Sequence, residues 1–246
     1  FRFDTEEADK RFRKWLKNRW FCPFALKKNA GRVTFTGIYL PYWTFDSQTI
    51  SHYTARYGIV RTVVVGHGDK RRTRTYVDWY YTRGTYDKFF NDCLVQGSMR
   101  HDMTLLGKIA PFDTEDNLAY KPEYLAGFVA ERYSIGLDSA WSTAKGKIER
   151  DLYSCVSQEI RFRHHADRVE NLRMSISHSD VTFKYLMLPV WMSHYEYKNK
   201  TYHFMINGQT GKVGGKAPIS FWQVLLAVIG SAAFVALLYL LLYFLG

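Results

Sequence analysis

Cysteine is scarce in this sequence. The three cysteines are Cys22, Cys93 and Cys155, and their wide spacing matches neither a disulfide framework nor a C-x-x-C zinc knuckle. Three catalytic signatures are also missing: a Walker-type glycine-rich loop, a G-x-S-x-G elbow and an H-E-x-x-H pair. We therefore expect a non-enzymatic protein of a reducing compartment, with no catalytic, cofactor-binding or metal-binding residues in this chain.

Charge is missing from the C-terminal end. From Ala217 to Gly246 there is no Asp, Glu, Lys, Arg or His, so residues 1–216 carry the whole formal charge of +11. A helix from Phe221 to Leu245 would be about 37 Å long, enough to cross a hydrocarbon core of about 30 Å. A buried helix of a soluble protein is the alternative, but such a helix usually keeps a polar face. The sequence predicts one transmembrane helix within residues 219–245.

The residues that flank this segment predict its orientation. Trp222 at one end, and Tyr239 and Tyr243 at the other, suit the two headgroup layers. Lys212 and Lys216 precede the span and no charged residue follows it, so the positive-inside rule places residues 1–216 in the cytoplasm. We expect a single-pass protein of the inner (cytoplasmic) membrane.

Hydrophobic periodicity predicts an α+β fold in the remaining residues. Residues 1–31 form amphipathic helices, the first over residues 4–20 with Asp4 as its cap, and residues 32–216 form the α+β domain. A long helix is predicted from Asp138 to His165, capped by Asp138 and with an apolar stripe that starts at Trp141. Antiparallel strands are predicted over residues 32–45, 51–65, 73–81, 172–177, 181–197 and 201–207. Gly66 to Asp69 form a predicted hairpin turn, and Asn207-Gly208 begins another.

A short motif occurs twice. Pro41 and Trp43, and again Pro189 and Trp191, belong to a Leu-Pro-x-Trp pattern inside β-rich runs. Two copies of one small β-rich unit, each burying its tryptophan, would explain the recurrence. Chance is the other explanation in a chain that is 17% aromatic. A proline inside a strand also predicts a bulge or an edge position.

The basic charge permits two interpretations. A candidate basic surface on the predicted hairpin consists of Lys70, Arg71, Arg72 and Arg74. Such residues contact phosphates in nucleic-acid-binding proteins, but a domain close to an anionic bilayer also gains from being basic, and we favour the second source. His178, His194 and His203 lie in neighbouring predicted strands, where scattered histidines are usually ordinary residues rather than metal ligands.

Several motifs together carry a family resemblance. The longest runs from Gly37 through Asp46 to Thr49, and the others are Arg19-Trp20-Phe21, Asp92 with Leu94-Val95, Tyr120 to Phe128, Glu131-Arg132-Tyr133, Leu188 to Trp191 and Asn207 to Gly211. With these motifs the chain resembles a family of bacterial membrane proteins that have an N-terminal zinc ribbon and are often mislabelled helicase-like or primosomal protein N-prime. The resemblance implies a cytoplasmic ribbon before Phe1, which would hold any zinc. It also implies docking of flotillin-like (SPFH) or phage-shock-type proteins at the membrane.

The leading hypothesis is a non-enzymatic membrane anchor or scaffold that recruits a membrane-associated protein partner or forms a homo-oligomer. The alternative is a nucleic-acid-binding module tethered to the membrane, and a third hypothesis is an enzyme that uses an unrecognised constellation near Trp43 and Trp191. The helicase label finds no support in these residues, because no nucleotide-binding loop is present.

Overall fold

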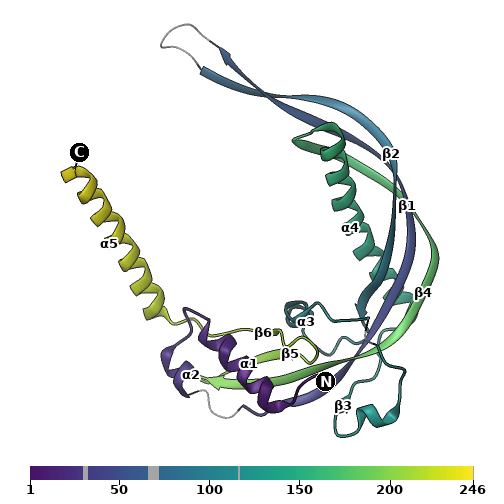
Figure 1. Ribbon diagram of the computed structural model, residues 1–246, viewed down its shortest axis with the longest axis vertical. Helices are drawn as coiled ribbons and strands as arrows, with labels where there is room; N and C mark the ends of the chain where they lie inside the picture. Colours follow the sequence, from purple (N-terminus) through teal and green to yellow (C-terminus); the bar gives the residue numbers. More distant parts are fainter. Residues whose placement is uncertain (30–32, 66–71, 116, 246) are drawn as a thin grey trace. The chain divides into compact units, whose positions relative to one another are not determined.

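A computed structural model describes residues 1–29, 33–65, 72–115 and 117–245. It confirms the predicted α+β class, with antiparallel strand pairs, one long helix and an apolar helix at the C-terminal end (Figure 1). The chain divides into two compact units. Unit 1 consists of Phe1–Pro41, Ser98–Arg132 and Met187–Gly246, and unit 2 consists of Tyr42–Gly97 and Tyr133–Leu186.

The strands form one sheet that draws on both units. The strand order in the described residues is β2-β1-β4-β5-β6, and β3 pairs with β1 in parallel. The bounds are β1 Thr36–Val65, β2 Arg72–Gln96, β3 Val129–Ala130, β4 Arg168–Tyr197, β5 Lys200–Asn207 and β6 Val213–Gly215. β1 and β2 pair antiparallel over most of their length. The hairpin turn predicted at Gly66 to Asp69 lies outside the described residues.

Three strands are longer than the sequence predicted. The segments predicted at 32–45 and 51–65 fall in the single strand β1, which begins at Thr36, and those predicted at 172–177 and 181–197 belong to β4. The strand predicted at 73–81 continues as β2 to Gln96. The polar Thr49, between the two predicted segments of β1, does not end the strand because its buried hydroxyl donates to the Lys88 carbonyl of β2 at 2.7 Å. In β4, Asn171 and Asp180 adopt φ of 51° without ending the strand, and Asn and Asp tolerate this left-handed conformation better than most residues.

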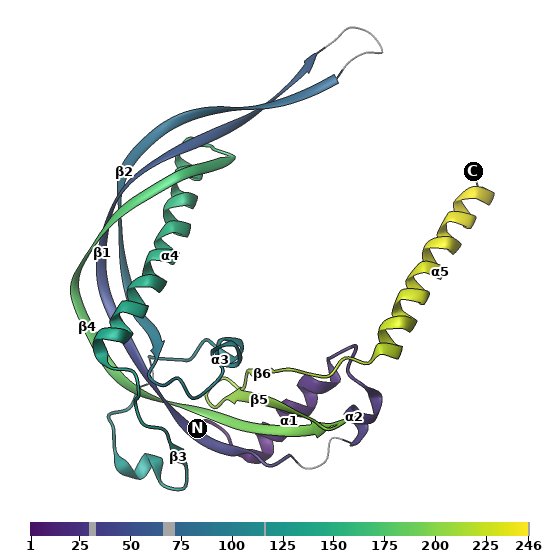
Figure 2. The same cartoon turned by 180° about the vertical axis from the view of Figure 1, so that it is seen from behind.

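Helix α4, Leu137–His164, covers one face of the sheet in unit 2 (Figure 2). The predicted stripe is confirmed from Ala144 onward. Its predicted first residue, Trp141, is only partly buried, and the buried stripe begins at Ala140 instead. The predicted Asp138 cap is also wrong: Gly136 precedes the first turn and makes no side-chain cap. The six fully buried residues of the stripe are Ala140, Ala144, Ile148, Leu152, Val156 and Ile160.

Helix α1, Thr5–Lys17, begins at the predicted cap, where the Asp4 carboxylate accepts from the Glu7 N–H at 3.0 Å. It is followed by α2, Phe24–Asn29. The apolar face of α1 is buried in unit 1, where the Phe12 ring stacks on Phe204 at 4.0 Å between ring centroids. The face is therefore occupied by the protein core. The other helices of unit 1 are α3, Met103–Ile109, the short 3₁₀ helix η2, Pro122–Leu125, and α5, Phe221–Leu245.

The two Leu-Pro-x-Trp copies occupy matching positions in the sheet. Pairing of β1 with β2 starts at Tyr42, one residue after Pro41, and pairing of β4 with β5 starts at Val190, one residue after Pro189. Each proline therefore precedes the first residue of a ladder, a place where its missing N–H costs no hydrogen bond to the outer strand.

The two tryptophans differ in their contacts, although both are buried. Trp43 is 1% exposed and its indole N–H donates to the Ile135 carbonyl at 2.9 Å. Trp191 is 5% exposed, and its indole nitrogen has no hydrogen-bond partner in the described part of the chain. The copies thus share register and burial but not polar contacts.

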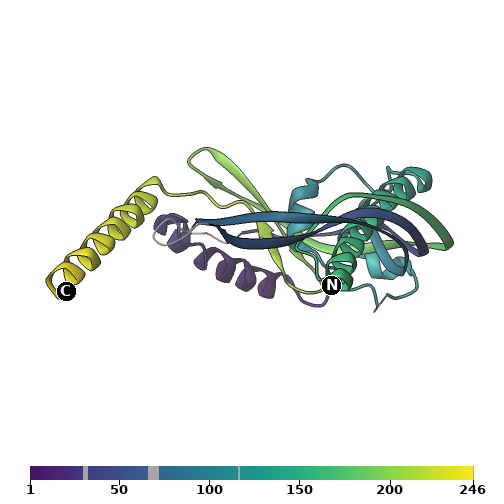
Figure 3. The same cartoon turned by 90° about the horizontal axis from the view of Figure 1, so that it is seen from above.

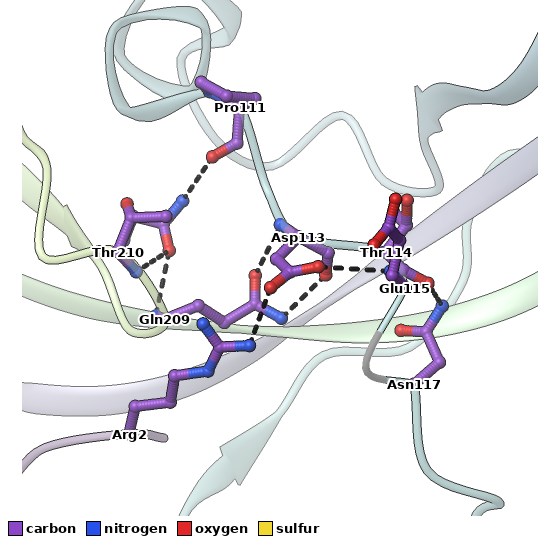
Figure 4. A network of polar contacts seen from close by, with 9 residues as sticks. Arg2, Pro111, Asp113, Thr114, Glu115, Asn117, Gln209 and Thr210 are labelled. Atoms are coloured by element: carbon purple, nitrogen blue, oxygen red, sulfur yellow. Dashed lines mark hydrogen bonds and ion pairs between the residues drawn. The ribbon is translucent and has the colours of Figure 1, made fainter.

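A polar network holds the Asn207-Gly208 turn of unit 1 (Figure 4). The buried Asn207 amide donates to the carbonyls of Ile109 and Pro111 at 3.0 Å, and its oxygen accepts from two backbone N–H groups of the turn. The Gln209 side chain both donates to and accepts from the Asp113 backbone. The positive φ of this turn falls on Gly211, at 75°. Asn207 is therefore a structural residue of the turn.

Helix α5 is one unbroken helix of 25 residues (Figure 3). It is long and apolar enough to cross a membrane, and none of its candidate span from Phe221 to Leu238 is buried by the rest of the protein. Phe221 and Trp222 are each 71% exposed, and Tyr243 is 72% exposed. The side chains of Tyr239 and Leu245 lie outside the part that the structure describes.

Candidate interaction surfaces

The end of the β1–β2 hairpin extends past the elements that cover the rest of unit 2. Asp167 immediately precedes β4 and contacts β1. Its N–H donates to the Gly58 carbonyl at 3.0 Å, and its carboxylate accepts from the Val60 N–H at 2.7 Å. His164, the last residue of α4, stacks on Tyr57 at 4.1 Å between ring centroids. Both covering elements therefore stop near Tyr57–Val60. We call the described residues beyond them, 61–65 and 72–76, the ribbon.

The ribbon exposes apolar and basic side chains on one face. Val63 and Val65 are 39% and 49% exposed and lie opposite Arg74 and Arg72 in the register, while Tyr76 is 45% exposed. Because cross-strand partners share a face, these residues form one surface. Arg72 and Arg74 of the predicted basic surface are thus exposed as expected. Lys70 and Arg71, predicted with them, lie outside the described residues.

A second exposed feature is a shallow groove on the sheet face of unit 2 that α4 leaves uncovered. Tyr53 and Ala55 are buried against α4, so Thr54 and Arg56 point to the opposite face. Two adjoining depressions there share Thr54, Arg83 and Arg173. We call this the arginine groove, formed by Arg56, Arg83 and Arg173.

The arginines of the groove differ in what they contact. Arg83 and Arg173 are exposed and form no ion pair within the described residues. The Arg56 guanidinium lies over the rings of Trp79 and Tyr81, at 5.2 and 5.6 Å from their centroids. The sequence analysis did not predict this groove, because its arginines come from three different strands. The only available signal was that each arginine lies on the strand face opposite the buried residues.

Two carboxylates of the resemblance motifs meet at a bulge in unit 2. The register of β1 and β2 shifts between Phe45 and Ser47, and Asp92 there adopts φ of 53°. The Asp46 carboxylate accepts from the Asp92 N–H at 2.8 Å and from the Thr182 hydroxyl at 2.9 Å. The Lys184 ammonium lies 3.6 Å from Asp46 and 3.3 Å from Asp92. Partial burial alone would raise the pKa of Asp46, but these three donors outweigh it and lower that pKa. The arrangement stabilises the bulge.

Glu131, another motif residue, is a buried acceptor in unit 1. Its carboxylate accepts a short hydrogen bond from the Ser98 hydroxyl and lies 2.7 Å from His101 Nε2. Because serine and histidine both contact the carboxylate, and no serine–histidine bond joins them among the described contacts, this is not the geometry of an activated nucleophile. Glu131 fixes the segment around Ser98 instead.

The three predicted strand histidines belong to different units. His194 and His203 are cross-strand partners in unit 1, with ring centroids 5.9 Å apart. His178 is in unit 2, where its Nδ1 lies 3.2 Å from the Ser47 hydroxyl, and burial followed by the nearby Lys145 charge lowers its pKa. Among the described residues, no group of three or more His, Cys, Asp or Glu has the arrangement of a metal site.

The two lysines before α5 are fixed to unit 1. The Lys212 ammonium donates to the Ala110 carbonyl, and the Lys216 carbonyl accepts from the Tyr195 hydroxyl at 3.0 Å. Both residues are therefore held by contacts within unit 1, in the segment that leads to α5. Their effect on the side of the membrane on which the units lie stays a prediction.

Comparison with known proteins yields one informative similarity. The chain is 30% identical over 225 residues to a Bacillus subtilis (strain 168) protein described as "Uncharacterized protein YdjG". The match covers 91% of this chain and 64% of that protein, so the chain spans less than two thirds of its relative. No family model matches the chain, and no solved structure matches it.

Proposed function

We propose that this chain is a non-enzymatic, single-pass membrane anchor or scaffold that recruits a protein partner to the cytoplasmic face of the membrane. The observation that carries the proposal is the ribbon. A two-stranded ribbon is marginally stable by itself in water, yet this one exposes Val63, Val65 and Tyr76 on one face. Such a surface on a chain that also carries α5 fits recruitment of a protein partner to the membrane.

The chemistry of the ribbon indicates what the partner must offer. Its apolar side chains lie beside Arg72 and Arg74, so a partner with an apolar patch edged by carboxylates would complement it. The resemblance points to a flotillin-like (SPFH) protein as the first candidate. Because apolar contacts are not screened by salt, the complex should survive several times the physiological salt concentration.

The test is a purification of the full chain in mild detergent together with the candidate SPFH protein. The variant Val63→Thr/Val65→Thr/Tyr76→Thr removes apolar surface and places threonine, a residue that strands favour, at all three positions. We expect it to lose the partner at least tenfold. The matched control, Leu118→Thr/Tyr120→Thr/Val129→Thr, changes exposed residues of unit 1 and should retain the partner. Equal retention by the two variants would remove the ribbon as the docking surface.

Sidedness is tested separately. If Lys212 and Lys216 set the topology, a reporter fused before Phe1 should be cytoplasmic, and replacing both lysines with Glu should weaken that preference. A reporter found outside the cytoplasmic membrane in the unmodified protein would overturn this part of the proposal.

A second candidate function, nucleic-acid binding, is favoured by exposed arginines that form no ion pair among the described residues. Arg83 and Arg173 in the groove, and Arg72 and Arg74 on the ribbon, are cations that phosphates could contact. Against it, Arg56 already lies over one ring face of Trp79 and one of Tyr81, which leaves less aromatic surface for stacking bases. We expect single-stranded DNA and RNA to bind weakly at about 0.15 M salt. Tight, saturable binding that Arg83→Ala/Arg173→Ala abolishes would favour this candidate instead.

A further inference from the structure

The segment between α1 and α2 lies directly beside the start of α5. The backbone N–H of Ser220, the residue before α5, donates to the Phe21 carbonyl at 2.8 Å. Residues Arg19–Phe24, which we call the juxtamembrane turn, are therefore held at the level where the apolar helix begins. If α5 crosses a bilayer from Phe221, this level is the headgroup layer.

The juxtamembrane turn exposes large aromatic side chains. Trp20 is 86% exposed, Phe24 is 74% exposed and Phe21 is 41% exposed. At the start of α5, Ile219, Phe221 and Trp222 are exposed to a similar degree. Exposed apolar side chains thus come from two segments joined by a hydrogen bond, and tryptophan is the residue that membrane interfaces favour. The apolar surface of α5 continues into the turn.

The turn itself is firmly anchored in unit 1. Cys22 is 1% exposed and Leu26 is 6% exposed, and both belong to the same core cluster as Leu16 of α1. The Cys22 N–H also donates to the Arg19 carbonyl at 3.1 Å. Because this inner side is fixed, Trp20 and Phe24 are presented outward by a rigid support.

All charged residues in the surrounding sequence are basic. Between Asp9 and Asp46 there is no acidic residue, whereas the segment contains Lys14, Lys17, Arg19, Lys27 and Lys28, among others. The Arg19 guanidinium lies over the Trp15 ring at 4.6 Å, and the Lys27 ammonium donates to the Lys17 carbonyl at 3.1 Å. These contacts keep positive charge next to the exposed aromatics. Positive charge close to the bilayer favours anionic lipids.

We propose that the juxtamembrane turn is a second membrane contact, which inserts Trp20 and Phe24 into the headgroup layer of the leaflet where α5 begins. Its ligand is the lipid interface, with a preference for anionic headgroups. The contact differs from an amphipathic helix lying on the membrane, because the apolar face of α1 is already buried in the protein. It would hold unit 1 against the bilayer rather than leave it on a free tether. The inference rests on the proposed span of α5.

The test uses the full chain reconstituted into phosphatidylcholine vesicles, with and without phosphatidylglycerol. An environment-sensitive fluorescent amino acid replaces Trp20 in one sample and Met99, which is 81% exposed in the same unit, in the control. Lipids that carry a quencher near the headgroup or near the chain end report the depth of the probe. At position 20 we expect the shallow quencher to quench at least twofold more strongly than the deep quencher. At position 99 we expect no quenching by either.

Further samples separate the possible failures. A probe at Leu226, in the middle of the first half of α5, should be quenched by the deep quencher. If it is not, the membrane span itself fails. If position 226 is quenched but position 20 behaves as position 99, only the juxtamembrane contact is overturned. If the fluorescence of the probe at position 20 changes only when another protein is added, the turn contacts a protein partner instead of lipid, which would also overturn the proposal.

The charge contribution has its own variant. In the protein with the probe at position 20, Arg19→Gln/Lys27→Gln should abolish the extra quenching caused by phosphatidylglycerol while leaving quenching in pure phosphatidylcholine unchanged. An undiminished effect of phosphatidylglycerol would overturn the preference for anionic headgroups.

Discussion

Helices α4 and α5 are similar in length, with 28 and 25 residues, but they meet different surroundings. α4 carries charged side chains on one side and buries a stripe of six fully covered residues against unit 2. α5 has no charged residue, and no residue of its candidate span is buried by the protein. The comparison shows that a helix with one apolar stripe packs on a sheet by that stripe, whereas a helix that is apolar on all sides is one that a membrane or other protein would cover.

The largest effect is expected under α4, at Trp43. The Trp43 side chain packs with Ala140 and Ala144 of the helix, so Trp43→Ala should lower the free energy of unfolding by about 3–5 kcal/mol, as for other buried aromatics. Trp191→Ala should cost a similar amount in unit 1. Chemical denaturation of the detergent-solubilised protein measures both. A loss below 1 kcal/mol at Trp43 would mean that the surface under α4 is not core.

A matched pair of leucines sharpens the comparison between the helices. Leu152 of α4 is fully buried, so Leu152→Ala should cost about 2–5 kcal/mol. Leu226 of α5 is 68% exposed, so Leu226→Ala should leave the unfolding of the two units unchanged. Equal losses in the two variants would show that α5 packs on protein as α4 does.

The smallest effect is expected at the bulge beside the sheet surface. Asp46→Asn should cost about 1–2 kcal/mol near pH 7, because it weakens hydrogen bonds to a charged acceptor. Since the pKa of Asp46 is lowered in the folded state, its contribution is present above its unfolded pKa of about 3.9 and disappears as pH falls through the folded value. Denaturation of both proteins across this range should therefore show the difference shrinking on acidification. A constant difference would assign the loss to packing.

The sequence was sufficient where one segment determines the outcome. The uncharged tail predicted α5, and the periodicity of residues 144–160 predicted the buried stripe of α4. It was insufficient where distant strands decide. The continuity of β1 depends on partners in another strand, such as the Lys88 carbonyl that accepts from Thr49. Ala140 rather than Trp141 begins the buried stripe of α4, because a small residue lets the start of the helix lie close to the sheet. The matching register of Pro41 and Pro189 also appears only once strands are paired.

The candidate surfaces show the same division. The exposed positions of Arg72 and Arg74 follow from one predicted hairpin. The arginine groove joins side chains from β1, β2 and β4, and the juxtamembrane turn joins Phe21 to Ser220 across almost 200 residues of sequence. No local pattern contains such pairings, since they arise from the tertiary structure.

The most direct test of the account is whether α5 resides in lipid. Alkaline carbonate extraction of membranes should leave the full chain in the membrane pellet, from which only detergent releases it. The variant Val228→Arg/Val235→Arg places two charges on exposed positions of α5. Each charge near the centre of a span raises the free energy of membrane insertion by about 2.5–3.5 kcal/mol, so the variant should move to the soluble fraction. Val228→Leu/Val235→Leu should behave as the unmodified chain. Release of the unmodified chain by carbonate alone would contradict the membrane anchor.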